Sequence, residues 1–66
     1  MLNRIKEERS KQGIGQLELA ARVDVSRQTI HSIETARFIP STLLALKLAR
    51  ELGSTVEQLF LLEESD

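Results

Sequence analysis

Apolar residues recur along most of the chain at intervals of three and four, which is the spacing of one face of an α-helix. Aromatic residues make up only 3% of the sequence and the β-branched residues are not clustered, so no segment favours a strand. Five segments carry the helical spacing: residues 3–12, 16–23, 27–35, 42–52 and a segment that opens at 55. We therefore predict an all-α domain of five helices.

Residues that commonly cap helices lie at the ends of these segments. Residues suited to the N-cap are found at the start of three of them: Asn3, Ser26 and Ser41. Gly13 and Gly53 follow the first and fourth segments, and each suits a left-handed C-terminal cap. Residues 55–58 match the capping box, in which the Thr and Gln side chains satisfy each other's backbone donors. The boundaries of the predicted helices rest on these residues.

The chain is short, and its composition excludes several classes of protein. Its 66 residues, 41% of them apolar, fit one small domain over residues 1–66. With no cysteine and one histidine, we expect no disulfide, no zinc site and no cofactor. The longest apolar run, residues 59–62, is far below the roughly 20 residues of a membrane span. Because no apolar region follows Arg4 and Lys6, we expect no signal peptide. From these features we expect a cytoplasmic protein, and because no nucleophile–base set is present, we do not expect an enzyme.

The net charge of −1 hides an uneven distribution of charge. Residues 1–50 hold nine Lys and Arg against five Asp and Glu, which gives +4, whereas residues 51–66 hold five acids and no base, which gives −5. The basic part of the chain can bind a polyanion. A solvated acidic terminus without a functional role explains the asymmetry equally well.

The segment 16–35 carries the functional prediction, because it joins two short helices by a tight turn. Ala20 is small enough for the helices to cross closely, Asp24 tolerates the left-handed conformation of a turn, and Val25 can plug the turn into the core. The second helix then presents polar side chains near its N-terminus, where base edges would lie. This is the pattern of a helix-turn-helix.

These residues resemble the lambda-repressor/Cro-like family of regulators, also called XRE-type. The resemblance is strongest in the segments 16–20 and 25–30, and it continues through Pro40, Gly53 and residues 56–60. It implies a compact five-helix lambda-repressor-like domain that binds double-stranded DNA, with the helix-turn-helix formed by the second and third helices.

The sequence departs from the family pattern at three places. Gly15 stands where the family usually has a Ser or Thr cap, Asp24 replaces a common turn glycine, and residues 35–36 replace a common Asn-Gly. These departures lie outside the polar face of the third helix.

The resemblance and the chemistry of the side chains together give a set of DNA contacts. Gln28 can pair with the N6 and N7 atoms of adenine, and Arg27 can reach guanine or a phosphate. We expect three residues to contact bases: Arg27, Gln28 and, by the resemblance, Ser32. Four more are candidates for the DNA backbone: Gln16, Thr29, His31 and Arg37. Simple exposure is an equally good interpretation of His31.

In the resembled family, a pair such as Arg9 and Glu34 joins the first helix to the end of the recognition helix, residues 27–35. The alternative is two separate solvated charges.

A second apolar stripe on the fourth helix predicts a homodimer. Leu44, Ala45 and Leu48 already occupy the core face of this helix, so a chain of this size cannot also bury the other stripe. We expect a dimerisation region at about residues 43–66, whose interface residues are Leu43, Leu46, Arg50, Leu61 and Leu62.

Together these predictions describe a homodimeric, nucleoid-associated transcriptional regulator, most simply a repressor, on a palindromic operator. We expect no small-molecule effector. The alternatives are an antitoxin or restriction–modification controller of the same fold, or a helical protein-interaction module that does not bind DNA.

Overall fold

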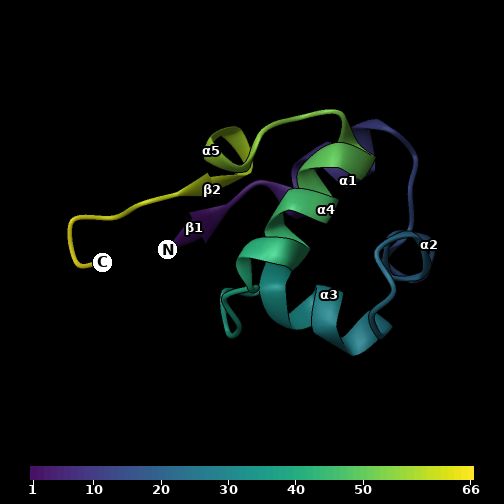
Figure 1. Cartoon of the computed structure of the whole chain (residues 1–66), viewed down its shortest axis with the longest axis horizontal. Helices are drawn as coiled ribbons and strands as arrows, with labels where there is room; N and C mark the ends of the chain where they lie inside the picture. Colours follow the sequence, from purple (N-terminus) through teal and green to yellow (C-terminus); the bar gives the residue numbers. More distant parts are fainter.

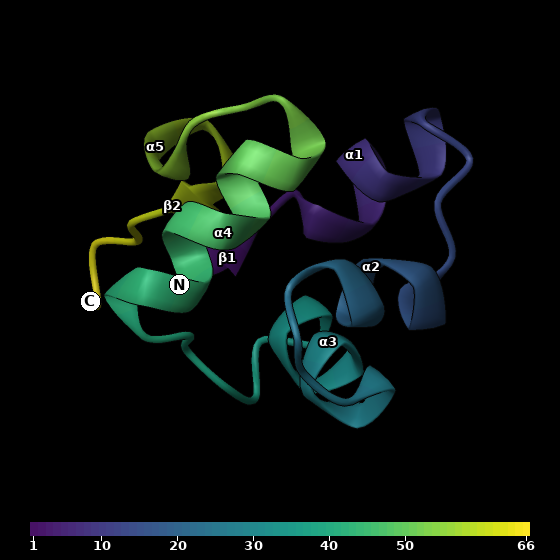
Figure 2. The same cartoon turned by 45° about the vertical axis from the view of Figure 1, so that its right-hand side comes forward.

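The computed structural model describes residues 1–66, the whole chain, and it is mostly helical. Figure 1 shows its five helices, which are α1 (Ile5–Lys11), α2 (Gln16–Arg22), α3 (Arg27–Glu34), α4 (Thr42–Leu52) and α5 (Val56–Leu59). α4 lies in the middle, with α3 on one side of it and α5 on the other (Figures 1 and 2). The predicted five-helix fold is confirmed. None of the helices is long and apolar enough to cross a membrane.

Three of the helix ends are built by the residues that the sequence indicates. The Ser26 hydroxyl accepts a hydrogen bond from the backbone N–H of Thr29 at 3.1 Å, and that of Ser41 accepts one from Leu44 at 3.2 Å. Gly53 adopts the left-handed conformation at φ 65° and ends α4. Local chemistry therefore sets these boundaries.

The start of the chain differs from the prediction, because it forms a strand rather than a helix cap. β1 (Leu2–Asn3) pairs antiparallel with β2 (Phe60–Leu61), and α1 begins only at Ile5. The side chain of Asn3 does accept a hydrogen bond from the Ile5 N–H at 3.2 Å, as an N-cap would, but it also donates to the carbonyl oxygen of Ile33 at 2.8 Å. Asn3 thus ties the chain start to the end of α3.

The capping box before α5 is only half formed. The Gln58 N–H donates to the Thr55 hydroxyl at 3.2 Å, as predicted, but the side chain of Gln58 accepts from the Ser54 hydroxyl at 3.0 Å. The prediction of a reciprocal bond from the Gln58 side chain to the Thr55 N–H is wrong, because the Gln58 oxygen accepts from the Ser54 hydroxyl instead. α5 ends at Leu59, where the chain becomes extended and enters β2.

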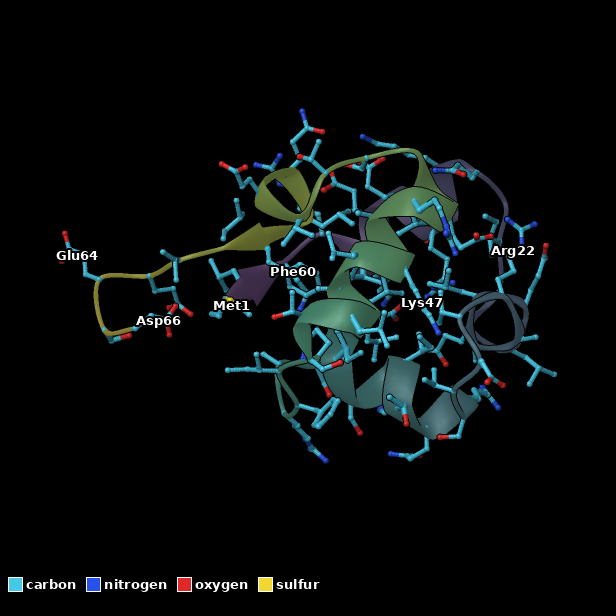
Figure 3. All side chains as sticks on the ribbon, in the orientation of Figure 1. Met1, Arg22, Lys47, Phe60, Glu64 and Asp66 are labelled. Atoms are coloured by element: carbon cyan, nitrogen blue, oxygen red, sulfur yellow. The ribbon has the colours of Figure 1, made fainter.

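The acidic tail returns to the start of the chain. The ammonium group of Met1 lies 2.9 Å from a Glu63 carboxylate oxygen and 3.1 Å from one of Asp66, and Figure 3 shows Met1 and Asp66 side by side. Hydrogen bonds with Glu63 and Asp66 raise the pKa of this ammonium group. Glu63 and Asp66 of the acidic segment are therefore paired with the first residue of the chain.

One apolar core joins all five helices. Every buried residue is apolar, and twelve of them form one cluster. Ile5 of α1, Leu19 of α2, Ile30 of α3, Leu48 of α4 and Leu59 of α5 have no exposed surface. This shared core fixes α2 and α3 relative to the rest of the chain and so positions the site described next.

Candidate nucleic-acid interface

The turn between α2 and α3 has the geometry that the sequence predicts. Asp24 adopts a left-handed conformation at φ 59°. The N–H of Val25 then donates to the carbonyl oxygen of Ala20 at 3.0 Å, and Ala20 is 1% exposed. The methyl side chain of Ala20 allows this close crossing, which a larger side chain would obstruct. The crossing directs one face of α3 away from the core.

The outward face of α3 is polar. Ile30 and Ile33 are buried beneath the helix, whereas Arg27, Gln28 and His31 are exposed. Thr29 and Ser32 are half-buried at the edges of this face. The Nε2 atom of Gln28 donates to the Ser32 hydroxyl at 3.4 Å, so one N–H and the carbonyl oxygen of its amide stay available.

All seven residues predicted to contact DNA line two open hollows that share Gln28. The first has a volume of about 260 Å³ and is lined by Gln16, Arg27, Gln28 and His31. The second has a volume of about 320 Å³ and is lined by Gln28, Thr29, Ser32, Arg37 and Phe38. We call these eight residues the polar surface. None of them is acidic, so no carboxylate opposes a phosphate there.

Phe38 is the member of the polar surface that sequence reasoning missed. It lies in the loop between α3 and α4, and its side chain is 47% exposed beside Arg37. The sequence does contain a signal for this residue. Phe38 is an aromatic residue that follows the recognition helix and does not fit the helical spacing of apolar residues. Its ring offers apolar contact to a sugar or a thymine methyl group.

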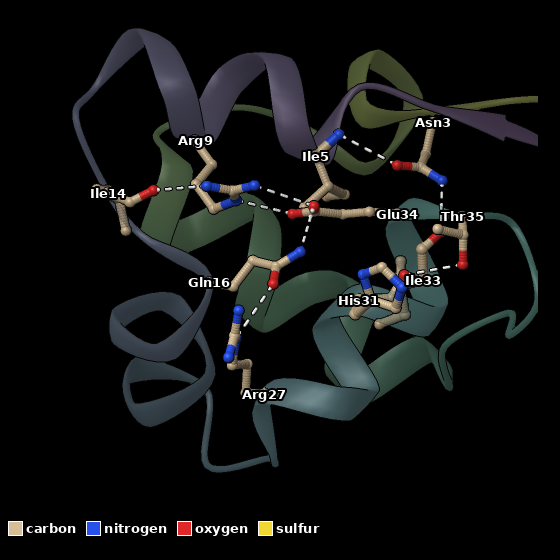
Figure 4. Close-up of polar contacts among 10 residues, drawn as sticks. All are labelled: Asn3, Ile5, Arg9, Ile14, Gln16, Arg27, His31, Ile33, Glu34 and Thr35. Carbon is tan, nitrogen blue, oxygen red and sulfur yellow. Dashed lines mark hydrogen bonds and ion pairs between the residues drawn. The ribbon is translucent and has the colours of Figure 1, made fainter.

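Arg9 of α1 and Glu34 of α3 form a bidentate ion pair beneath the polar surface (Figure 4). Arg9 Nε lies 2.8 Å from Glu34 Oε2, and Nη2 lies 3.0 Å from Oε1. The side chains are 12% and 3% exposed, respectively. Arg9 Nη1 also donates to the carbonyl oxygen of Ile14 at 3.0 Å. The pair therefore joins α1, the following turn and the end of α3.

Opposing effects set the pKa of Glu34. Burial raises the pKa of this carboxyl group, and the hydrogen bonds from Arg9 and Gln16, together with the charges of Arg9 and Lys6, lower it further than burial raises it. The hydrogen bond with Glu34 raises the pKa of Arg9. Both groups are thus charged at neutral pH.

Gln16, the first residue of α2, is bonded within the protein at both ends of its amide (Figure 4). Its Nε2 atom donates to Glu34 Oε1 at 3.0 Å, and its Oε1 atom accepts from Arg27 Nε at 3.3 Å. A continuous line of hydrogen bonds therefore runs from the half-buried Arg9 to the exposed Arg27.

A separate apolar area lies on α4 and beside α5. Leu43, Leu46 and Leu62 are 65%, 57% and 85% exposed, and the Arg50 side chain is 75% exposed. Leu61 differs from them, since it is half-buried in β2 opposite Leu2. Four of the five predicted interface residues thus project into solvent.

Leu46 also lines a hollow of about 420 Å³ between α4 and α5. Its lining is mostly apolar and consists of Met1, Ile39, Pro40, Thr42, Ala45, Leu46, Val56, Glu57 and Phe60. Leu43, Leu46, Lys47 and Arg50 border a smaller hollow of about 240 Å³ on the outside of α4. Leu46 therefore lines both hollows. No group of three His, Cys, Asp or Glu side chains lies close enough to hold a metal ion.

Comparison with known proteins extends these observations. Residues 5–59 match the model of a family described as helix-turn-helix. The chain is 48% identical over 61 residues to an uncharacterized HTH-type transcriptional regulator of Methanothermobacter thermautotrophicus, covering 91% of this chain and 88% of the relative. It is 41% identical over 66 residues to the uncharacterized HTH-type transcriptional regulator YgzD of Bacillus subtilis, and the match covers 100% of both chains.

A solved structure has the same fold. The clp gene regulator ClgR of Corynebacterium glutamicum superposes with a TM-score of 0.75 at 27% identity. The match covers 79% of this chain and 55% of that one, so the chain corresponds to about half of ClgR.

Proposed function

The chain belongs to the helix-turn-helix family of transcriptional regulators, and we propose that it recognises a specific sequence of double-stranded DNA with α3 in the major groove. The observation that carries this proposal is the polar surface, in which seven hydrogen-bonding side chains surround the exposed face of one helix without a carboxylate. A major groove admits a helix of this size, and its base edges offer both donors and acceptors.

Within this proposal, bases are read by Arg27 and Gln28 at the N-terminus of α3 and by Ser32, about one turn further along the helix. Gln28 keeps one N–H and its carbonyl oxygen free, which is the pair that adenine N7 and N6 require. Arg27 supplies donors only and so suits guanine O6 and N7. Ser32 lies beside Gln28 and completes the base-reading set. The remaining candidates bind the sugar–phosphate backbone: Gln16, Thr29, His31 and Arg37.

We further propose that the protein acts as a homodimer through α4 and the C-terminal residues. The interface comprises Leu43, Leu46, Arg50, Leu61 and Leu62. A two-fold axis there would place two copies of α3 in successive major grooves, about 34 Å apart, on a palindromic site. Bound near a promoter, such a dimer would repress transcription by excluding the polymerase. No small-molecule effector is part of the proposal.

Selection from a pool of random DNA tests the proposal directly. The full chain is incubated with the pool at two salt concentrations, and the bound sequences are read. We expect one enriched palindromic motif at both concentrations and weaker overall binding at the higher one, because phosphate contacts release counterions. Salt-sensitive binding without an enriched motif would refute specific recognition, and no binding at either concentration would refute DNA binding.

A further inference from the structure

The amide of Gln16 lies between two charged groups that fix its orientation. Glu34 accepts a hydrogen bond from Nε2 at 3.0 Å, and Arg27 donates one to Oε1 at 3.3 Å. A carboxylate only accepts hydrogen bonds and a guanidinium only donates them. An amide with one donating and one accepting end can therefore join the two in a single orientation.

Glu34 is a rigid end for this line of hydrogen bonds. Its side chain is 3% exposed, and Arg9 holds both of its oxygens through Nε and Nη2 at 2.8 and 3.0 Å. Because Arg9 also bonds to the carbonyl oxygen of Ile14, neither member of the ion pair can turn without breaking further contacts. The Gln16 amide is thus held from a fixed point inside the molecule.

Arg27, at the other end of these hydrogen bonds, is exposed, and its guanidinium group is held at one nitrogen only. Arg27 uses Nε for Gln16, and its two terminal nitrogens carry no hydrogen bond within the protein. A guanidinium held at Nε presents its Nη1 and Nη2 atoms outward together, which is the arrangement for an end-on bidentate contact with guanine O6 and N7.

We propose that Gln16 and Glu34 are positioning residues for base reading by Arg27: the buried carboxylate fixes the Gln16 amide, and the amide fixes the guanidinium. The proposal rests on the proposed function, since it concerns how one base pair of the bound DNA is discriminated. It assigns Glu34 a part in specificity besides its part in joining α1 to α3. It is compatible with a phosphate contact from the second N–H of Gln16.

The test measures discrimination at each base pair separately. The selected DNA site and its single-base variants are titrated with the full wild-type chain and with the Arg27→Ala variant, which identifies the base pair that Arg27 reads. Gln16→Met then removes the N–H donor and the carbonyl acceptor of the amide while keeping a side chain of similar length. We expect discrimination at the Arg27 base pair to fall about 2- to 10-fold, the effect of one hydrogen bond, with the Gln28 base pair unaffected.

A double variant and a matched control sharpen the result. Gln16→Met combined with Arg27→Ala should lose no more discrimination at that base pair than Arg27→Ala alone. Gln16 acts there only by positioning Arg27, so its replacement has no further effect once Arg27 is removed. Gln12→Met is the control, since Gln12 is an exposed glutamine whose amide bonds to the carbonyl oxygen of Leu52, away from Arg27. The Gln12→Met variant should discriminate between bases at the Arg27 base pair as well as the wild type does. Glu34→Gln, whose amide no longer fixes the orientation of Gln16, should reproduce the loss where the variant folds.

The outcomes separate this proposal from the function on which it rests. If Gln16→Met weakens binding to every sequence by the same factor, Gln16 contacts phosphate only and the proposal fails while the proposed function stands. The proposal also fails if the losses of Gln16→Met and Arg27→Ala add in the double variant. If the wild-type chain shows no preference among the single-base variants, the proposed function itself fails.

Discussion

At the scale of single residues, the side chains of the polar surface differ in how firmly the protein holds them. Arg27 bonds to Gln16 and Gln28 bonds to Ser32, whereas Arg37 has no side-chain hydrogen bond within the protein. A side chain that is already ordered loses less conformational entropy when it contacts DNA. The two strongest candidates for base reading are therefore also the better organised ones.

Replacing Gln28 tests base reading at one position. We expect Gln28→Ala to weaken binding to the selected site by about 1–3 kcal/mol and to relax the preference at a single base pair, because one bidentate contact is lost. The measurement is a titration of the site and its single-base variants. Arg37→Ala is the comparison, since a lost phosphate contact should weaken all sequences alike and reduce the salt dependence. Uniform weakening by Gln28→Ala would exclude base reading by this residue.

Replacing Glu34 tests the energy of the buried ion pair. In Glu34→Gln, Arg9 keeps its charge without a counter-ion at a site where it is 12% exposed. We expect the free energy of unfolding near neutral pH to fall by about 3 kcal/mol. Glu18→Gln is the control, because Glu18 forms an exposed pair with Arg22 and should change stability by less than about 1 kcal/mol. Urea unfolding gives both values, and equal effects would show that the Arg9–Glu34 pair is solvated.

The same carboxyl group predicts how stability depends on pH. Since the folded pKa of Glu34 lies below its ordinary value of 4.5, the unfolded chain binds the proton more readily. The stabilisation is therefore present above pH 4.5 and is lost as the pH falls through the folded pKa. Urea unfolding at about pH 7 and about pH 3 should show a smaller loss in Glu34→Gln than in the wild type. An equal loss would assign the acid sensitivity to other carboxyl groups.

At the scale of the elements, the turn that follows α3 contains a strained residue. Ala36 has a left-handed φ of 60°, and its N–H closes the helix by donating to the carbonyl oxygen of Ile33 at 3.0 Å. A side chain in this conformation costs about 1–2 kcal/mol relative to glycine. The strain lies two residues before Phe38, where the chain leaves the polar surface for α4.

Relieving this strain should stabilise the protein. We expect Ala36→Gly to raise the free energy of unfolding by about 0.5–1 kcal/mol, because the relief of strain exceeds the added entropy of the unfolded chain. Ala21→Gly is the matched control within α2, and there the same change should destabilise by a similar amount. Thermal unfolding of both variants gives the comparison. A destabilised Ala36→Gly protein would show that the backbone at this residue is not left-handed in solution.

The helices and strands also differ in how well the sequence alone predicts them. The helices and the caps at Ser26, Ser41 and Gly53 depend on neighbouring residues, so local patterns reveal them. β1 and β2 are two residues each, too short for an alternating pattern, and they pair across nearly the whole chain. The outward face of α3 follows from its helical period, whereas the amide orientation of Gln16 depends on Glu34 and Arg27 meeting in the folded structure.

At the scale of the whole molecule, two surfaces of different chemistry are joined by one short segment. The polar surface is centred on α3 and the apolar area on α4, and residues 35–41 lead from one helix to the other. Ile39 belongs to the apolar hollow and Phe38 to the polar surface, although they are adjacent in the chain. Association through α4 would therefore fix the distance between two copies of α3. This distance must match the spacing of the two half-sites in a palindromic DNA site.

Leu46→Glu tests this association, because Leu46 is 57% exposed and borders both hollows of the apolar area. A carboxylate there would be desolvated between two copies, so we expect monomers by sedimentation where the wild type forms dimers. Leu17→Glu is the control, since Leu17 is 69% exposed on α2, outside the apolar area, and should leave the dimer intact. An unchanged dimer mass for Leu46→Glu would exclude α4 as the interface. A monomeric variant should still bind one half-site through α3 but should lose the dependence on half-site spacing, because no interface then sets the distance between the two helices.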